Sequence, residues 1–412
     1  MSDTTESRPM SWNRWQIYSL AAAGLGVLLC IVAALVDWSG FLRSYVFAFC
    51  TFLAFPLGAM AILMLHQLTG GKWGAALQPA LKSALATLPV LVVLLIPLLI
   101  GITTLYPWAN TTILDGDALL KELVHKKVAY LNVPFFLIRT AVYVVVWLAM
   151  MALFLRWSSK PSEESPDGLN SKTQTLSGPG LVLFGLTVTF AAFDWIMSLE
   201  PEWFSSIFGV LIAASQCLPA FALGIVVLSL RQTSNTSKDS PTIKANTWND
   251  MGGLMLMFVL LWTYMSFSQF FLIWSGNLPE EVIYYTRRNN GLWLVISWLL
   301  GIFNFAVPFF LLMSGDIKRN PARLIWVAGG ILVIHVLHTY WLIKPAFIRD
   351  KDSSYIGVDV WDPFTFLAVG GLMIAAFLHF WNKWGHEYPV EQESVSHDGN
   401  HSESAIKPKP AS

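Results

Sequence analysis

Hydrophobic residues fall in ten long runs along this chain, separated by short polar segments. A bilayer core about 30 Å thick needs roughly 20 apolar residues per helix, so each run predicts one membrane-spanning helix. The runs lie near residues 16–36, 43–66, 84–106, 131–155, 179–198, 204–230, 248–273, 291–314, 322–343 and 361–382. The pattern therefore predicts an all-α integral membrane protein with ten transmembrane helices.

The polar ends of the chain predict three parts: an N-terminal tail over 1–15, a ten-helix transmembrane domain over 16–385 and a flexible C-terminal tail over 386–412. An even number of spans places both tails on the same side of the membrane. That side carries 16 Lys and Arg residues and the opposite loops carry 9. Because basic residues accumulate on the cytoplasmic side, both termini are predicted to be cytoplasmic.

Composition narrows the class of function. Hydrophobic residues make up 55% of the chain and charged residues 13%, with a formal net charge of zero. Without a basic surface, nothing indicates a nucleic-acid partner. Cys30, Cys50 and Cys217 lie far apart, without the CxxC or CxxCH spacing that iron–sulfur clusters and covalent haem use. We therefore expect no metal or cofactor in this chain.

One carboxylate interrupts the fifth apolar run. Between Pro179 and Glu200, Asp194 is the only ionisable side chain. A charged group inside hydrocarbon costs roughly 2.5 to 3.5 kcal/mol on insertion scales. Asp194 should therefore face a bundle interior or a wet cavity and have a partner there.

The fourth run supplies a candidate partner, Arg139. At 1.5 Å per residue, Arg139 lies about 12 Å below the outer end of its helix and Asp194 about 7 Å below the outer end of the next. An Arg139–Asp194 ion pair is therefore geometrically allowed. Such a pair could have a functional role, as a charged group in a proton path or at the edge of a quinone pocket. Alternatively, it could be a static ion pair that holds two helices together.

The segment SLEPEW places two further acids at the outer mouth of the fifth helix. Glu200 lies two helical turns from Asp194 and could extend a chain of acids outward. For Glu202 we predict a solvated turn, with Pro201 as the helix breaker. Asp194, Glu200 and Arg139 are therefore the candidate catalytic residues of a proton path.

The seventh and ninth apolar runs contain weaker indications of a functional site. Trp262, Ser266 and Gln269 share one helical face, which suits a quinone headgroup and a file of water molecules equally well. His335 and His338 share a face of the ninth run. We interpret them as packing histidines, with a cavity lining as the alternative.

Three stretches together resemble a known family: LMLHQLTGGKWG at 63–74, FAAFDWIMSLEPEWFSSIFG at 190–209 and SFSQFFLIWSGNLPEEVIYYTRR at 266–288. They resemble the membrane subunits of bacterial alternative complex III, specifically the second quinone-type subunit, within the wider NrfD and polysulfide-reductase membrane-anchor family. The resemblance extends over roughly 12–385. It implies two four-helix bundles, formed by spans two to five and six to nine, with spans one and ten beside them.

The resemblance also implies a function in the bacterial cytoplasmic (inner) membrane. The chain would be a subunit of a respiratory quinol:cytochrome c or quinol:oxidase complex that oxidises menaquinol or ubiquinol. Expected partners are a multihaem cytochrome c with haem c, a protein with iron–sulfur clusters and a homologous quinol-oxidising membrane subunit, with a terminal oxidase as a further candidate. This chain would hold no redox centre and would contribute architecture and proton translocation, with Asp194 and Glu200 on the path.

One position departs from the family pattern. The family often has histidine where this chain has Glu202, which leaves any imidazole role at that position open. Two other functions remain as alternatives: a secondary transporter, which would also use ten spans and buried ionisable groups, and a purely structural anchor whose buried polar groups join helices.

Overall fold

The computed structural model describes residues 12–116, 118–158, 168–234, 243–348 and 356–385. Most of the two predicted tails, 1–11 and 386–412, lies outside the described residues. Within the described part all regular structure is helical. Ten helices or helix series there are long and apolar enough to cross a membrane. The prediction of an all-α protein with ten membrane-spanning helices is confirmed.

The ten spans are α1 (Trp12–Val36), α2 (Trp38–Thr69), α3 (Lys72–Leu85) continued by α4 (Leu88–Leu94) and α5 (Ile96–Ile100), α9 (Val133–Trp157), α10 (Ser171–Trp195), α11 (Phe208–Ser234), α12 (Ala245–Gly276), α14 (Gly291–Leu300) continued by η3 (Gly301–Ala306) and α15 (Val307–Met313), α17 (Pro321–Ile343) and α18 (Asp362–Trp384). Short helices connect them: α6 (Ile102–Leu105), η1 (Pro107–Ala109), α7 (Thr111–Gly116), α8 (Ala118–Lys126), η2 (Met197–Leu199), α13 (Pro279–Thr286), α16 (Gly315–Arg319) and η4 (Lys344–Phe347).

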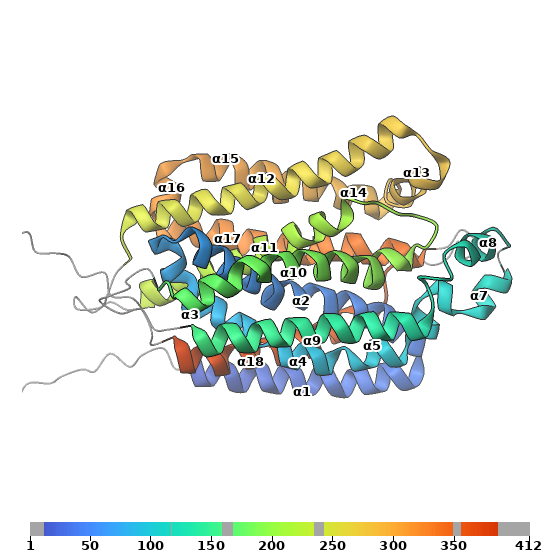
Figure 1. Ribbon diagram of the computed structural model, residues 1–412, viewed down its shortest axis with the longest axis horizontal. Helices are drawn as coiled ribbons and strands as arrows, with labels where there is room; N and C mark the ends of the chain where they lie inside the picture. The colour runs from blue at the N-terminus through green and yellow to red at the C-terminus, as the bar shows by residue number, and fades with distance from the viewer. Residues whose placement is uncertain (1–11, 117, 159–167, 235–242, 349–355, 386–412) are drawn as a thin grey trace, which may run out of the picture.

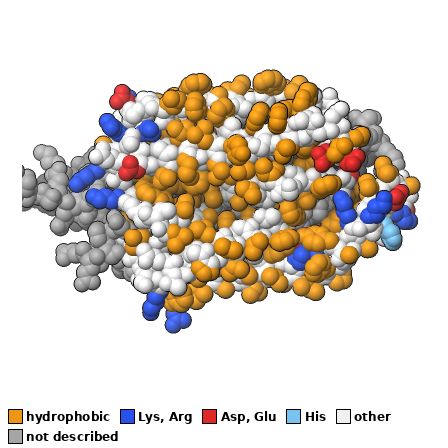
Figure 2. Space-filling view, turned by 45° about the horizontal axis from the view of Figure 1, so that its top comes forward, with side chains coloured by type: hydrophobic (Ala, Val, Ile, Leu, Met, Phe, Trp, Pro, Cys, Tyr) orange, Lys and Arg blue, Asp and Glu red, His pale blue; other side chains and the backbone are white. Residues whose placement is uncertain are grey.

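The surface has the distribution of a membrane protein. Figure 2 shows hydrophobic side chains over the middle of the visible face and charged side chains gathered toward its two ends. Large apolar residues of the spans are exposed, such as Leu35 of α1 at 83% and Trp326 of α17 at 81%. Such exposure would be unfavourable in water and is favourable against lipid. The chain is therefore a multi-pass membrane protein.

Two helices form the centre of the molecule. Within its most apolar window α2 is 94% buried, whereas the corresponding window of α1 is 22% buried. α2 packs against α1, α3, α10, α11, α17 and α18, and α11 packs against α2, α3, α10, α12 and α17. At the crossing of α2 and α11, a Cβ atom on Gly58 would lie 2.1 Å from the carbonyl oxygen of Gln216. Only glycine allows this close approach.

Two spans are interrupted. The third span breaks into α3, α4 and α5 near Pro89 and Pro97, because proline cannot donate the helical hydrogen bond. The eighth span contains the π-helical turn η3 just before Pro308. By contrast, Pro56 and Pro219 lie inside α2 and α11, which continue through them.

The fifth span begins earlier than its apolar run. α10 starts at Ser171, eight residues before the predicted start at 179. The side chain of Asn170 accepts a hydrogen bond from the backbone of Lys172 and caps the helix. A capping residue therefore extends the helix into a polar segment that hydrophobicity alone assigns to a loop.

The short helices mark the two ends of the molecule. In Figure 1, α7, α8 and α13 lie at the right-hand end, which we call the loop end. α16 and the C-terminal part of α18 lie at the opposite end. The polar residues considered next are concentrated in the half of the molecule nearer the loop end.

Candidate functional site

Asp194 and Arg139 form a buried ion pair. Arg139 lies in the second turn of α9, and its Nε and Nη2 atoms donate to Oδ2 and Oδ1 of Asp194, each over 2.8 Å. Asp194, one residue from the end of α10, has no exposed surface, and Arg139 is 8% exposed. A bidentate contact of this kind is among the strongest side-chain pairings. The predicted pair is therefore confirmed, whereas a proton-path role for it remains a prediction.

Two tyrosines complete this Asp194 cluster. The hydroxyl of Tyr143 donates to Oδ2 of Asp194 over 2.7 Å. The remaining Nη1 of Arg139 donates to the backbone oxygen of Tyr130 over 3.0 Å, and the guanidinium lies 3.8 Å from the centre of the Tyr130 ring. Burial, followed by the charge of Asp194, raises the pKa of Tyr130. Tyr143 was not among the residues predicted from the sequence, although its position four residues after Arg139 places both on one helical face.

Three donors therefore hold the Asp194 carboxylate, two from Arg139 and one from Tyr143. Arg139 also neutralises its charge. Arg139 and Tyr143 belong to α9 and Asp194 to α10, so the cluster joins these two spans. Transfer of a proton through this carboxylate would require Arg139 to move away or a donor to be exchanged.

Glu200 belongs to a second cluster, formed with Arg287 and Arg288 from the segment after α13. Nη2 of Arg288 donates to Oε2 of Glu200 over 2.8 Å, and Nη1 of Arg287 donates to Oε1 over 3.0 Å. Glu200 is 4% exposed. The described contacts thus join Glu200 to two cations and do not continue the Asp194 cluster outward.

Glu202 lies in the same cluster, and the prediction of a solvated turn for it is wrong. Its Oε1 pairs with Nη2 of Arg287 over 2.6 Å, and its side chain is only 19% exposed. The chain does turn at Pro201, as predicted. The turn packs against Arg287 and Arg288, which follow α13, so Glu200 and Glu202 are shielded from solvent and paired with arginine.

Arg288 is the centre of this Glu200 cluster. Besides Glu200, its guanidinium donates to the backbone oxygens of Tyr284 at 2.8 Å and Leu342 at 3.0 Å. Burial alone lowers the pKa of Arg288, but the Glu200 carboxylate more than offsets this effect, and the pKa lies above its ordinary value. Arg288 therefore ties together the 200–203 turn, α13 and the end of α17.

A third cluster surrounds Lys344, which has no exposed surface. Its Nζ pairs with Oδ2 of Asp359 over 2.8 Å and also pairs with Asp362. Asp359 accepts a further ion pair from Arg43 over 2.8 Å, and Asp362 accepts the hydroxyl of Tyr340 over 2.9 Å. This Lys344 cluster joins α2, α17 and α18. Lys344 and Asp359 lie between the predicted spans 322–343 and 361–382, and nothing in their local sequence indicates their partners.

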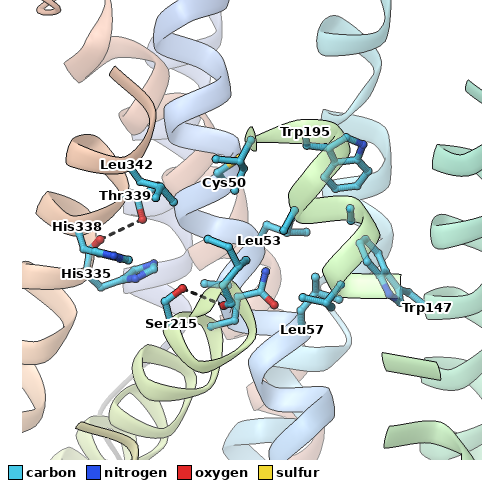
Figure 3. A pocket seen from close by; sticks show the side chains of 17 residues that line it. Cys50, Leu53, Leu57, Trp147, Trp195, Ser215, His335, His338, Thr339 and Leu342 are labelled. Atoms are coloured by element: carbon cyan, nitrogen blue, oxygen red, sulfur yellow. Dashed lines mark hydrogen bonds between the residues drawn. The ribbon is translucent and has the colours of Figure 1, made fainter. Parts of the chain in front are cut away.

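A small polar cavity lies where α2, α9, α10, α11 and α17 meet (Figure 3). Its volume of about 30 Å³ leaves room for at least one water molecule. Figure 3 shows His335 and His338 on one side and Trp147 and Trp195 on another. Nε2 of His335 lies 3.1 Å from the backbone oxygen of Thr51. The cavity-lining alternative for the two histidines is therefore correct, although His335 also satisfies a packing contact.

A much larger cleft, of about 960 Å³, lies between α12, α13, α14 and α17. Trp262, Ser266 and Gln269, the predicted polar and aromatic face of α12, all line it. His338 lines both this cleft and the small central cavity. The polar and aromatic face predicted from the sequence thus borders a cleft in the structure.

No protein-family model matches the chain, and no curated protein shows significant similarity to it. The fold and the site therefore rest on the chain's own residues. The described residues form a ten-span helical membrane protein with three ion clusters toward its loop end and a large, mostly apolar cleft beside them.

Proposed function

We propose that this chain is an integral membrane subunit of a respiratory quinol-oxidising complex of the alternative complex III type, in the bacterial cytoplasmic membrane. It contributes architecture and a candidate proton path. Haem c and iron–sulfur clusters belong to its partner subunits, and menaquinol or ubiquinol is the substrate of the whole complex. The basis for this proposal is the resemblance of three sequence stretches to that family.

One structural observation supports it most. Two of the stretches that carry the resemblance, 190–209 and 266–288, bind one another through Glu200 and Arg288, which are 88 residues apart. The third stretch, 63–74, folds into a tight turn in which His66 lies 3.1 Å from the backbone oxygen of Gly71. The residues of the resemblance thus form defined tertiary contacts and are not generic apolar sequence.

The helix packing is compatible with two four-helix bundles. Among spans two to five, α2 packs on α3 and α10, and α10 packs on α9. Among spans six to nine, α11 packs on α12 and α17, and α12 packs on α15. In this proposal the two bundles meet along α2 and α11, spans one and ten lie beside the first bundle, and both termini are cytoplasmic.

The broken spans favour this proposal over a secondary transporter. Transporters with repeated halves place interrupted helices at corresponding positions of the two halves. Here the interruptions fall in span three and span eight. Span three is the second helix of the first bundle and span eight is the third helix of the second, so the two positions do not correspond.

Purification of the chain from its native membrane in mild detergent tests the respiratory proposal. We expect multihaem cytochrome c and iron–sulfur subunits to accompany it, with quinol oxidation activity and a haem c signal in the redox difference spectrum. A chain that purifies alone, colourless and without these partners would contradict the proposal and redirect attention to transport assays.

A charge-balanced variant tests the proton path. The double substitution Asp194→Asn with Arg139→Gln removes both charges and leaves no buried ion unpaired. If the pair carries protons, the assembled complex should lose proton translocation or turnover. If the pair only joins α9 and α10, the assembled complex should keep both activities.

A further inference from the structure

The cleft beside α12 opens toward the bilayer. α12 contacts α15 and α16 near the opposite end of the molecule and diverges from α14 toward the loop end (Figure 1). Trp274 and Trp298, which line the cleft, are 72% and 67% exposed on the lipid-facing surface. A molecule dissolved in the membrane could therefore enter between the two helices without crossing the protein.

The cleft is deep and aromatic. It extends from Asn290, before α14, to Trp262, which lies 14 residues before the end of α12. At 1.5 Å per residue this corresponds to roughly 21 Å of helix. Eight of the 24 lining residues are Trp, Tyr or Phe. Such walls suit a flat ring with a long apolar tail.

The charge of the lining residues indicates which kind of ligand head group fits the cleft. Among the described residues that line the cleft, Arg288 carries the only charged side chain. Its guanidinium already binds Glu200 and the backbone oxygens of Tyr284 and Leu342. The described lining therefore offers a phosphate group no cation that is not already paired, and it favours a neutral head group over the head group of a phospholipid.

The inner end of the cleft offers two ring nitrogens with unused hydrogen-bonding capacity. Trp262 is 6% exposed, and its Nε1 is buried without a hydrogen-bond partner among the described residues. His338 is 4% exposed, and its imidazole ring makes no hydrogen bond within the described residues, although the backbone of His338 is bonded inside α17. The two rings meet edge to face, with their centres 5.3 Å apart. A buried donor without a partner is unfavourable, and a ligand oxygen could satisfy it.

From these observations we propose that the cleft binds the head ring of a quinone or quinol. A ring oxygen accepts the Nε1 hydrogen of Trp262, and the hydroxyl of a quinol donates to the imidazole of His338. The isoprenoid tail follows the opening between α12 and α14 into the bilayer.

His338 also links this site to the centre of the molecule, because it lines the small central cavity as well. In that cavity Oε1 of Gln216 is buried without a partner among the described residues. A water molecule there would satisfy Gln216 and lie near the imidazole. Occupation of the cleft and hydration of the central cavity would then be coupled through His338.

This inference rests on the proposed function in one respect, the identity of the ligand. A quinol is the substrate of the proposed complex, so a quinone or quinol is the ligand that the cleft would encounter. The test is therefore a direct binding experiment that needs neither partner subunits nor turnover. The full-length protein, in whatever assembly it purifies, is placed in lipid nanodiscs and photolabelled with an azido-substituted ubiquinone.

We expect the label on peptides from α12 and α14, and we expect excess decylubiquinone to remove it. Trp262→Phe and His338→Gln should each weaken labelling about two- to tenfold, the factor that corresponds to the net free energy of one hydrogen bond. Trp326→Phe and His379→Gln are matched controls on lipid-facing or exposed positions of α17 and α18, and they should leave labelling unchanged.

Three outcomes would overturn the inference: label confined to other helices, label displaced by phosphatidylglycerol and not by decylubiquinone, or equal effects of the cleft and control substitutions. The position of the label on the wild-type protein is by itself enough to support or overturn the inference, so the test does not depend on whether the variants fold. Absence of haem and iron–sulfur partners would contradict the proposed function, whereas absence of label in an active complex would contradict this inference alone.

Discussion

Glu200 and Arg288, 88 residues apart in the chain, face each other with Oε2 and Nη2 separated by 2.8 Å. Both side chains are buried, at 4% and 1% exposed. The contact fixes the turn after α10 against the segment after α13. A buried charge that loses its partner is strongly destabilising, so this pair is a sensitive point for the loop end of the molecule.

Arg288→Lys should destabilise the protein although it preserves the charge. A lysine amine is a single point donor and cannot reach both Glu200 and the backbone oxygens of Tyr284 and Leu342. We expect a loss of about 2 to 4 kcal/mol, since several charge-assisted hydrogen bonds are removed. The measurement is unfolding of the protein by titration with SDS, followed by circular dichroism.

Arg323→Lys is the matched control, because Arg323 is exposed on α17. It should leave the unfolding midpoint unchanged. If Arg288→Lys were as harmless as this control, the guanidinium geometry would not matter and the interpretation of the Glu200 cluster would be wrong.

The Asp194 cluster predicts strong coupling in a double-mutant cycle. Asp194→Asn and Arg139→Gln should each lower the free energy of unfolding by about 3 to 5 kcal/mol, because each leaves the opposite charge buried and unpaired. The double variant should recover much of that loss. The three variants and the wild type are compared by the same SDS titration.

The exposed pair of Asp115 with Lys121 provides the reference for this cycle. Their side chains are 68% and 61% exposed and their charges are 2.8 Å apart. Asp115→Asn should give no measurable change, because solvent screens exposed pairs. Additive losses in the Asp194 cycle would show that the two charges act independently.

The Lys344 cluster predicts unequal roles for two cations that share Asp359. Lys344 is fully buried and pairs with two carboxylates, whereas the side chain of Arg43 is 25% exposed and binds Asp359 from the edge of the cluster. Lys344→Met should therefore lower the apparent unfolding temperature far more than Arg43→Met does. Differential scanning fluorimetry of the two variants measures this directly, and equal shifts would contradict the predicted asymmetry.

Close packing between α1 and α18 predicts opposite outcomes for two neighbouring glycines. A Cβ atom on Gly26 would lie 2.5 Å from the backbone nitrogen of Ala368, whereas one on Gly24 would meet nothing within 4 Å. Gly26→Ala should therefore weaken the docking of α1, because backbone atoms cannot move aside cheaply. Gly24→Ala should be neutral or slightly stabilising, since alanine favours helices. The measurement is the rate at which a protease cleaves the connection between α1 and α2.

Much of the fold could be predicted from the sequence because a membrane imposes local rules. Each span must be apolar over about 20 residues and must satisfy its own backbone, and both properties can be read from consecutive residues. The same reasoning identified Asp194 as a buried charge that needs a partner, and helix depth identified Arg139 as the candidate. Boundaries were less certain where a cap such as Asn170 extends a helix into polar sequence.

The ten spans, the isolation of Asp194 and the polar face that contains Trp262 are thus properties of consecutive residues and can be predicted without a structure. Only the tertiary structure decided that Glu200 pairs with Arg288 and that Arg43 reaches Asp359, 316 residues away. Tertiary packing also makes His338 a lining residue of both cavities. Apolar length is a property of neighbours along the chain, whereas the partner of a buried charge depends on how distant helices pack, which local sequence does not encode.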